Sequence, residues 1–233
     1  MQKNMAKLTD SKTRIIAKII SKNYTGHLNR ILVVGCGSGV EAAILADELN
    51  AEVTGIDLID NFDTEASKYA TLKTGDATSL NFEDGAFDLI YSYHALEHIK
   101  NPLEALKEMN RVLRISGGYW IGTPNRSRLV GYLGSKDATW KQKLKWNLSD
   151  WKTRIKGKFR NEFGAHAGFF SWELGSFLRE TFFDTKDITN IYYLEMYKRH
   201  TSLINIIIHL NLRKFLFPAV YFMGIKLEEK RNV

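Results

Sequence analysis

The 233-residue chain lacks several features that would place it in familiar protein classes. It has a single cysteine, Cys36, so no intrachain disulfide can form and a disulfide-stabilised scaffold is excluded. It has no run of 18 apolar residues, and its first 18 residues lack the apolar segment of a secretory signal peptide. No internal repeat or low-complexity segment is visible. We therefore expect a cytoplasmic protein without a transmembrane helix.

The chain does contain enough apolar sequence for one full core, since 44% of its residues are hydrophobic and 12% are aromatic. Its net charge of +7 is unevenly distributed. Between Arg126 and Arg160, 11 lysines and arginines accompany only Asp137 and Asp150, whereas the rest of the chain is close to neutral. A basic segment on a near-neutral body indicates an anionic partner surface.

Apolar runs alternate with segments of helical periodicity over the first half of the chain. We predict strands at 31–34, 52–56, 71–74, 87–92 and 118–123, and helices at 10–22, 39–49, 63–70 and 102–114. This alternation predicts an α/β fold with an open parallel sheet and helices on both faces. Beyond it we predict an amphipathic helix from residue 171 and strands at 186–194 and 219–226.

The glycine-rich segment from Gly35 to Gly39 is the centre of the predicted binding site. It joins a buried strand to a helix, so its backbone can approach a ligand closely, and the helix start favours an anionic group. Asp57 ends the next strand, 22 residues after Gly35, where its carboxylate can accept hydrogen bonds from both ribose hydroxyls. Position 40 is Val, so the dinucleotide pattern G-x-G-x-x-G is incomplete. These residues predict a nucleotide-like ligand.

Taken in order, the motifs of this half closely resemble class I S-adenosylmethionine-dependent methyltransferases. The resemblance rests on VVGCGSG at 33–39, VTGIDL at 53–58, TGDATSLNFEDGAFDLIYSYHALEHI at 74–99 and NPLEALKEMNRVLRISGGYWIGTPN at 101–125. Within that family the chain is most similar to ubiquinone-biosynthesis-type O-methyltransferases and to methyltransferases of cell-surface glycan pathways. The resemblance covers about residues 29–125, and more loosely 164–182. It implies a Rossmann-like, mostly parallel seven-stranded sheet.

The resemblance also implies the cofactor, S-adenosylmethionine, with S-adenosylhomocysteine as product. It implies that the glycine loop holds the methionyl part, Asp57 the ribose and Asp76 the adenine, while main-chain groups at Tyr91 and Ser92 line the sulfonium. The predicted cofactor site comprises Gly35, Cys36, Gly37, Gly39, Asp57, Leu58, Asp76, Ala77, Tyr91 and Ser92. A helix cap or a turn role for Asp57 and a turn role for Asp76 are the alternatives. For Cys36 we favour packing over a nucleophilic role.

Three histidines, His94, His98 and His166, are candidates for the base that methyl transfer to a hydroxyl requires. His94, Glu97 and His98 are spaced i, i+3, i+4 and share a face if this turn is helical. The spacing matches an inverted zinc-protease motif, but it follows a strand end instead of lying on a long helix, and we predict no metal. His166 lies between small residues, where similar family members place a histidine over the substrate. The alternative for Glu97 and His98 is a structural cap. The alternative for His166 is a surface loop position.

Residues 126–170 form a basic insertion after the fifth predicted strand. Apolar residues recur in it at i, i+4, i+8, i+11 and i+15, with lysines and arginines on the remaining faces; they are Trp140, Leu144, Leu148, Trp151 and Ile155. Tryptophan beside basic residues is typical of a helix in an anionic membrane interface. The alternative is a lid whose stripe packs on the catalytic domain. We expect membrane contact through residues 136–160 and 203–217, the second segment being too short to span a bilayer.

We therefore predict a single domain over 1–233, with an N-terminal helix (1–28), a cofactor-binding core (29–125), a basic lid or insertion (126–170) and the C-terminal part of the sheet with an apolar helix (171–233). The predicted function is O-methylation of a small-molecule, glycan or lipid-linked acceptor, at the inner face of a membrane. An RNA-directed methyltransferase and a non-catalytic cofactor-binding partner are the alternatives. Nucleic acid is not the expected partner, because the fourth strand lacks the Asn/Asp-Pro-Pro-aromatic motif of base methylation.

Overall fold

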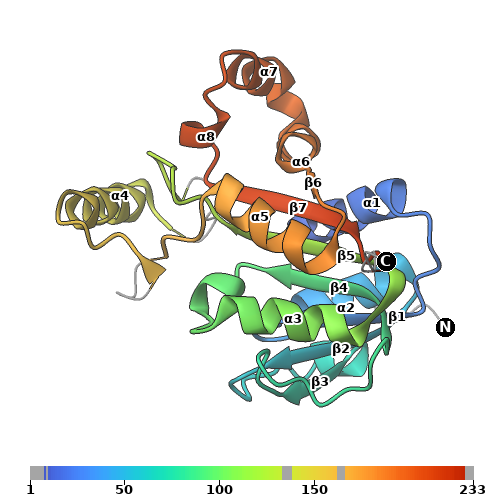
Figure 1. Cartoon of the computed structure of the whole chain (residues 1–233). Coiled ribbons are helices and arrows are strands. Elements are labelled where there is room, and N and C mark those ends of the chain that lie inside the picture. Colours follow the sequence, from blue (N-terminus) through green and yellow to red (C-terminus); the bar gives the residue numbers. More distant parts are fainter. Residues whose placement is uncertain (1–7, 9, 133–137, 162–165, 229–233) are drawn as a thin grey trace, which may run out of the picture.

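The computed structural model describes residues 8, 10–132, 138–161 and 166–228. A seven-stranded sheet of order β3-β2-β1-β4-β5-β7-β6 forms its centre (Figure 1). Strands β1 to β5 are parallel, and β7 runs antiparallel to β5 and β6. Their bounds are β1 Arg30–Val34, β2 Glu52–Asp57, β3 Thr71–Thr74, β4 Phe87–Tyr93, β5 Leu113–Pro124, β6 Lys186–Asp187 and β7 Ala219–Ile225. The predicted Rossmann-like, mostly parallel sheet is confirmed.

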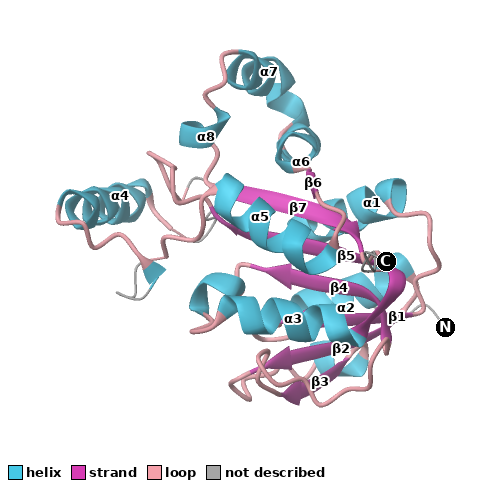
Figure 2. Ribbon diagram, viewed as in Figure 1, coloured by secondary structure: helices cyan, strands magenta, loops and turns pink. Residues whose placement is uncertain are grey.

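Helices cover both faces of this sheet. They are α1 Ser11–Asn23, α2 Val40–Leu49, α3 Pro102–Val112, α4 Trp140–Ile155, α5 Ser171–Phe182, α6 Thr189–Met196, α7 Thr201–His209 and α8 Arg213–Leu216, with 3-10 turns η2 Ala66–Lys68, η3 Leu96–His98 and η5 Lys198–His200. Figure 2 shows α3 and α5 in front of the sheet and α2 behind it. Residues of α1, α2 and α6 pack together in one core cluster, and those of α3 and α5 in another.

The apolar run of β1 explains why both faces need helices. Ile31 and Val33 lie in the cluster with α1, α2 and α6, whereas Leu32 and Val34 lie in the cluster with α3 and α5. Successive side chains of a strand point to opposite faces, so a strand buried on both faces is apolar at every position. The continuous run in the sequence is therefore the signature of a central parallel strand.

The strand predicted at 118–123 was wrong at its start. α3 ends at Val112, and β5 begins at once with Leu113. The Gly117-Gly118 pair lies inside the strand instead of breaking the chain before it. The pairing of β5 with β4 shifts register between Phe87 and Leu89, so an irregularity in the ladder absorbs the extra residues.

The strand predicted at 186–194 was also wrong beyond its first two residues. β6 ends at Asp187. The Asp187 side chain accepts a hydrogen bond from the Thr189 backbone N–H at 2.9 Å, and this bond helps to start α6. Ile188, Tyr192 and Tyr193 are buried at helical spacing. The predicted helix at 63–70 is reduced to the single turn η2.

The basic insertion contains the predicted helix, α4, which lies apart from the sheet beyond the end of β5 (Figure 1). No residue of α4 is buried. Its apolar stripe is exposed to solvent, so the alternative of a lid whose stripe packs on the catalytic domain does not hold. In the part of the chain that the structure describes, no helix is long and apolar enough to cross a bilayer. Residues 136 and 137 of the expected membrane segment lie outside the described residues.

Candidate active site

The candidate site lies at the edge of the sheet where the parallel strands end. The segments that follow β1, β2 and β4 all leave the sheet at this edge, because these strands run in the same direction (Figure 1). In open α/β sheets, ligands bind in the crevice outside the carboxyl ends of the strands. The predicted cofactor residues are found in the last part of β2 and of β4, in the segments after β1 and β2, and in the turn after β3.

The glycine loop after β1 is packed closely at its two ends and open in the middle. Gly35, Gly37 and Gly39 all have positive φ angles, of 73°, 53° and 85°. A Cβ atom on Gly35 would collide with Ala95, and one on Gly39 would collide with Leu72. A Cβ atom on Gly37 would meet nothing within 4 Å. The loop therefore offers its backbone to a ligand at Gly37.

Asp57 joins the end of β2 to this loop. Its Oδ2 accepts a hydrogen bond from the Gly37 backbone N–H at 2.8 Å, and its Oδ1 accepts one from the Ile59 N–H at 3.3 Å. It ends a strand and caps no helix, so the helix-cap alternative does not apply, whereas the bond from Ile59 is a turn contact of the kind the other alternative predicts. A carboxylate has about four acceptor positions, which leaves room for ribose hydroxyls. The neighbouring Leu58 side chain is 71% exposed at the same edge.

Asp76 lies in the turn after β3. Its Oδ1 accepts hydrogen bonds from the Thr78 backbone N–H at 2.8 Å and from the Thr78 hydroxyl at 2.7 Å. These two bonds, the backbone one first, lower the pKa of the Asp76 carboxyl, so it is ionised. Ala77, which follows it, is buried. The turn role is present, and the adenine contact stays a prediction.

Cys36 is buried under the glycine loop. Burial, and then the negative charge of Asp57, raise the pKa of the thiol to about 12. A thiol with so high a pKa holds almost no thiolate at neutral pH, which supports packing over nucleophilic chemistry.

Tyr91 and Ser92 are fully buried in β4. The Tyr91 hydroxyl donates a hydrogen bond to Glu41 Oε2 at 3.1 Å. The Ser92 Oγ is buried without a hydrogen-bond partner among the described residues. An unpaired buried hydroxyl costs free energy, so it indicates a position that a ligand can complete.

A contact between α1 and this edge of the sheet was not predicted. Lys12 of α1 forms an ion pair with Glu41, at the start of α2, with 3.0 Å between Nζ and Oε1. The same ammonium lies 4.1 Å from the centre of the Tyr93 ring. Burial raises the pKa of Glu41, and Lys12 opposes this rise. The one signal in the sequence was an acidic residue directly after the glycine loop.

His94, Glu97 and His98 meet at the tip of β4, as their spacing predicts. Glu97 Oε1 lies 3.7 Å from His94 Nδ1 and 4.0 Å from His98 Nε2. The turn is not an α-helix: His94 has a φ of 54°, and only Leu96–His98 are helical, in the 3-10 turn η3. Glu97 therefore lies at the centre of the cluster. From the sequence we placed Glu97 in the motif but did not predict it as a base.

Burial changes the acid–base properties of this cluster. The Glu97 side chain is 1% exposed, its Oε2 has no partner among the described residues, and burial raises its pKa to about 7 against the opposing charge of Arg128. His94 is about a third exposed, but its Nε2 is buried and equally unpartnered; desolvation, then Lys12 and Arg128, lower its pKa to about 3. Glu97 can exchange a proton near neutral pH, whereas His94 is a weak base.

His166 is brought to the same cluster from the other side of the insertion. Its ring centre lies 4.9 Å from that of His98, and its side chain is exposed. The His166 carbonyl accepts a hydrogen bond from Arg128 Nη2 at 2.8 Å. Arg128 is 4% exposed and also pairs with Asp150 of α4 at 3.1 Å. The structure thus brings all three predicted histidines together, and Arg128 is a positioning residue that the sequence missed.

Gly168 should be the least replaceable glycine near this loop. Its φ is 69°, and a Cβ atom there would overlap the backbone carbonyl of Pro124, which cannot move aside. Gly157 has a similar φ of 67°, but its Cβ position is open. We expect Gly168→Ala to lower the free energy of unfolding by about 1–3 kcal/mol more than Gly157→Ala, measured by urea denaturation. Equal costs for the two variants would show that the contact with Pro124 does not matter.

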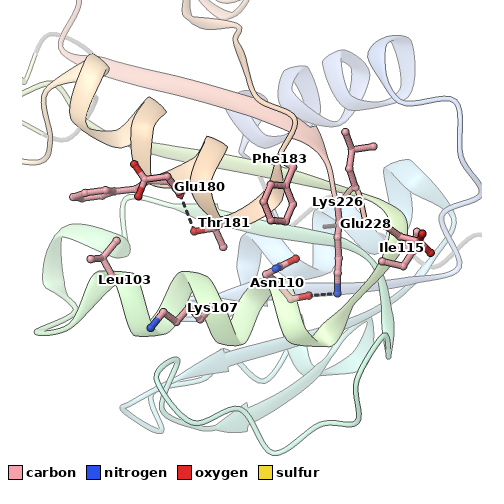
Figure 3. Close-up of a pocket in the computed structure, with 11 residues that line it drawn as sticks. Leu103, Lys107, Asn110, Ile115, Glu180, Thr181, Phe183, Lys226 and Glu228 are labelled. Atoms are coloured by element: carbon pink, nitrogen blue, oxygen red, sulfur yellow. Dashed lines mark hydrogen bonds between the residues drawn. The ribbon is translucent and has the colours of Figure 1, made fainter. Parts of the chain in front are cut away.

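Within the residues that the structure describes, neither a metal site nor the large groove belongs to the candidate active site. Among the described residues, no group of three or more His, Cys, Asp or Glu side chains could hold a metal ion. A groove of about 1160 Å³ lies along α3 and α5, and Figure 3 shows Leu103 and Lys107 on one side and Glu180 and Thr181 on the other. None of its lining residues belongs to the predicted site. The groove lies on a helical face, away from the strand ends.

Comparison with known families identifies the core of the chain. Residues 32–121 match the family model of the methyltransferase domain. This stretch is a class I methyltransferase domain. The demethylmenaquinone methyltransferase of Staphylococcus aureus is 38% identical over 96 residues, which cover 38% of this chain and 40% of that enzyme. The match to these curated relatives thus spans less than half of their length.

Solved structures share the fold of the methyltransferase domain. Phosphoethanolamine N-methyltransferase 2 of Haemonchus contortus, solved with S-adenosyl-L-methionine, has a TM-score of 0.57 and 16% identity over 93% of this chain and 53% of its own. The [4+2]-cyclase SpnF has a TM-score of 0.56 and 17% identity over 93% of this chain and 81% of its own. The predicted fold is thereby confirmed.

S-adenosylmethionine is the cofactor of this class of domain, and the residues at the strand ends fit it. The space over Gly37 is open, the Asp57 carboxylate lies beside the Gly37 N–H, and the Ser92 hydroxyl lacks a partner within the described ranges. A backbone cradle, a ribose acceptor and a polar strand tip are the groups that an adenosyl cofactor needs. The contacts of the individual residues with the cofactor stay predictions.

Proposed function

We propose that this protein transfers the methyl group of S-adenosylmethionine to a hydroxyl of a small-molecule, glycan or lipid-linked acceptor. The observation that carries the proposal is the buried cluster at the tip of β4. Ser92, His94 and Glu97 each have a buried polar atom without a partner in the described part of the chain. Such atoms next to a cofactor cradle favour a site that a polar substrate completes.

In this proposal, Asp57 holds the ribose, Asp76 the adenine and the glycine loop the methionyl part. When bound, the cofactor would supply a methyl group on a positively charged sulfur, which the acceptor oxygen could attack. Glu97 takes the proton of the acceptor hydroxyl, since burial keeps its pKa near neutrality. His98 and His166 position the acceptor from the open side of the cluster, and the buried surroundings of Glu97 exclude water.

A lipid-linked acceptor is the most favoured of the three classes. The S. aureus relatives are named for a demethylmenaquinone, although the match spans only 40% of their length. SpnF, named as a [4+2]-cyclase, shares the fold, so the fold alone does not establish methyl transfer. Calorimetry with S-adenosylmethionine tests cofactor binding. Mass spectrometry of candidate acceptors after incubation separates an enzyme from a binding protein.

His166→Ala should reduce turnover by about 100-fold while S-adenosylmethionine affinity stays nearly unchanged. The reason is that His166 borders the acceptor side of the cluster, beside His98, and not the glycine loop. The measurements are steady-state kinetics and calorimetry. His27→Ala, an exposed histidine near the N-terminus of β1, is the matched control. Wild-type turnover in His166→Ala would remove this residue from the mechanism.

A further inference from the structure

Helix α4 binds the rest of the protein through its polar face. Asn147 Oδ1 accepts a hydrogen bond from the Gly131 N–H at 2.7 Å. Asp150 pairs with Arg128 at 3.1 Å, and Arg154 donates to the Arg128 carbonyl at 2.7 Å. Asn147, Asp150 and Arg154 are spaced i, i+3, i+7, so they share one face. Trp151 Nε1 also donates to the Leu129 carbonyl at 3.1 Å, and the Trp146 ring lies against the Tyr132 ring. Together these contacts orient α4 against the segment that follows β5.

The apolar face of α4 is turned outward. All five members of its stripe are exposed: Trp140 by 70%, Leu144 by 52%, Leu148 by 61%, Trp151 by 42% and Ile155 by 84%. A surface helix of a globular protein normally does the reverse and buries its apolar face. An apolar patch that a protein holds in solvent with specific contacts marks an interaction surface. The arrangement therefore predicts a partner for this stripe.

Lysines border the stripe. At about 100° per residue, Lys141, Lys145 and Lys152 follow Leu148 around the helix, on the side away from the polar face. Lys156 and Lys158 continue the basic surface beyond the helix end. Within the described ranges, no carboxylate lies at ion-pair distance from any of these five lysines. The partner of the stripe should therefore carry negative charge beside an apolar layer.

An anionic lipid bilayer has both properties. Tryptophans prefer the boundary between headgroups and acyl chains, where an amphipathic helix lies flat with its basic side chains near the headgroups. The 16 residues of α4 extend about 24 Å, enough for a helix that lies on the surface. Leu203 and Ile206 of α7, with Leu210 directly after it, are also exposed apolar residues. An RNA would explain the lysines but not the stripe.

We propose that α4 docks this protein onto an anionic membrane surface, with the stripe of Trp140, Leu144, Leu148, Trp151 and Ile155 in the interface and the lysines on the headgroups. Because α4 is anchored to the segment after β5, docking places the carboxyl edge of the sheet near the lipid. The proposal does not depend on methyl transfer, and it can be tested without cofactor or acceptor.

The test is sedimentation of the full chain with vesicles of equal parts phosphatidylglycerol and phosphatidylcholine. We expect binding that weakens as salt increases, and little binding to phosphatidylcholine alone. The double variant Trp140→Ser/Leu148→Ser should bind at least about tenfold more weakly, because it loses two apolar anchors. Trp172→Ser is the matched control, since Trp172 is 72% exposed on α5, and it should bind like the wild type.

Four results would overturn the proposal. The first is no vesicle binding at any salt concentration, and the second is equal weakening by Trp172→Ser. The third is a concentration-dependent dimer in sedimentation velocity that Trp140→Ser/Leu148→Ser abolishes, because the stripe would then bind a second copy. The fourth is tight binding of single-stranded RNA that the stripe variant does not change and that vesicles do not displace. Circular dichroism of the stripe variant confirms that a loss of binding is not a loss of fold.

Discussion

Asp57→Ala is expected to weaken S-adenosylmethionine binding by about 100-fold or more in calorimetry. Two charge-assisted hydrogen bonds to a ribose contribute about 1.5–3 kcal/mol each, and about 2.7 kcal/mol corresponds to 100-fold in affinity. The same carboxylate also accepts the hydrogen bond of the Gly37 N–H at 2.8 Å. Its removal therefore takes away the ribose acceptor and a bond that fixes the glycine loop.

A matched control separates these effects from a general change of charge. Asp60 is an exposed aspartate three residues further along, and Asp60→Ala should leave the affinity unchanged. Asp57→Asn keeps an acceptor for Gly37 but loses the charge, so it should fall between wild type and Asp57→Ala. Equal affinity of Asp57→Ala and wild type for S-adenosylmethionine would remove Asp57 from the cofactor site.

Glu97→Gln is expected to reduce kcat by about 1,000-fold and to stabilise the fold. General-base catalysis contributes about 100- to 10,000-fold, and an amide cannot take the proton of the acceptor. S-adenosylmethionine affinity should change little, since Glu97 lies in the turn after β4 and not in the glycine loop. Steady-state kinetics and calorimetry measure the two effects. Glu104→Gln, on the exposed start of α3, is the control and should change neither.

The stability effect follows from the direction of the pKa shift. The pKa of Glu97 rises from an ordinary 4.5 to about 7 in the folded state, so the folded protein binds a proton that the unfolded chain releases. The free energy of unfolding therefore falls as pH increases from about 4.5 to about 7, and then levels off. Relative to wild type, Glu97→Gln should gain about 2–4 kcal/mol above pH 7 and little below pH 4.5. A pH-independent difference in urea denaturation would contradict the buried, raised pKa.

The parallel part of the fold was predictable because its signals are local. Each central strand is buried on both faces and so reads as an unbroken apolar run, and β3 was placed at its observed bounds. The segment 188–194 was wrongly predicted as a strand because its composition, rich in branched and aromatic residues, favours strands. In the structure, Ile188, Tyr192 and Tyr193 are buried at helical spacing. Strand propensity and helical spacing of the apolar residues point to different structures here. The packing partners, which the sequence does not show, determine which structure forms.

The candidate site was predictable where it depends on motif spacing and not where it depends on burial. The glycine loop, Asp57 and the three histidines come from patterns within the chain. The central position of Glu97 depends on its 1% exposure, and the role of Arg128 depends on contacts with Asp150 and His166, both far along the chain. The stripe of α4 was visible in the sequence, but its outward direction is set by the hydrogen bonds of the polar face beside it.

The shared guanidinium of Arg128 links two events that would otherwise be independent. One nitrogen, Nη2, bonds both to Asp150 on α4 and to the carbonyl of His166 at the acceptor side of the site. A partner that fixes α4 therefore also fixes His166, and an acceptor that fixes His166 steadies α4. Thermodynamic linkage makes this coupling reciprocal: whatever factor a lipid surface adds to acceptor affinity, the acceptor must add to lipid affinity.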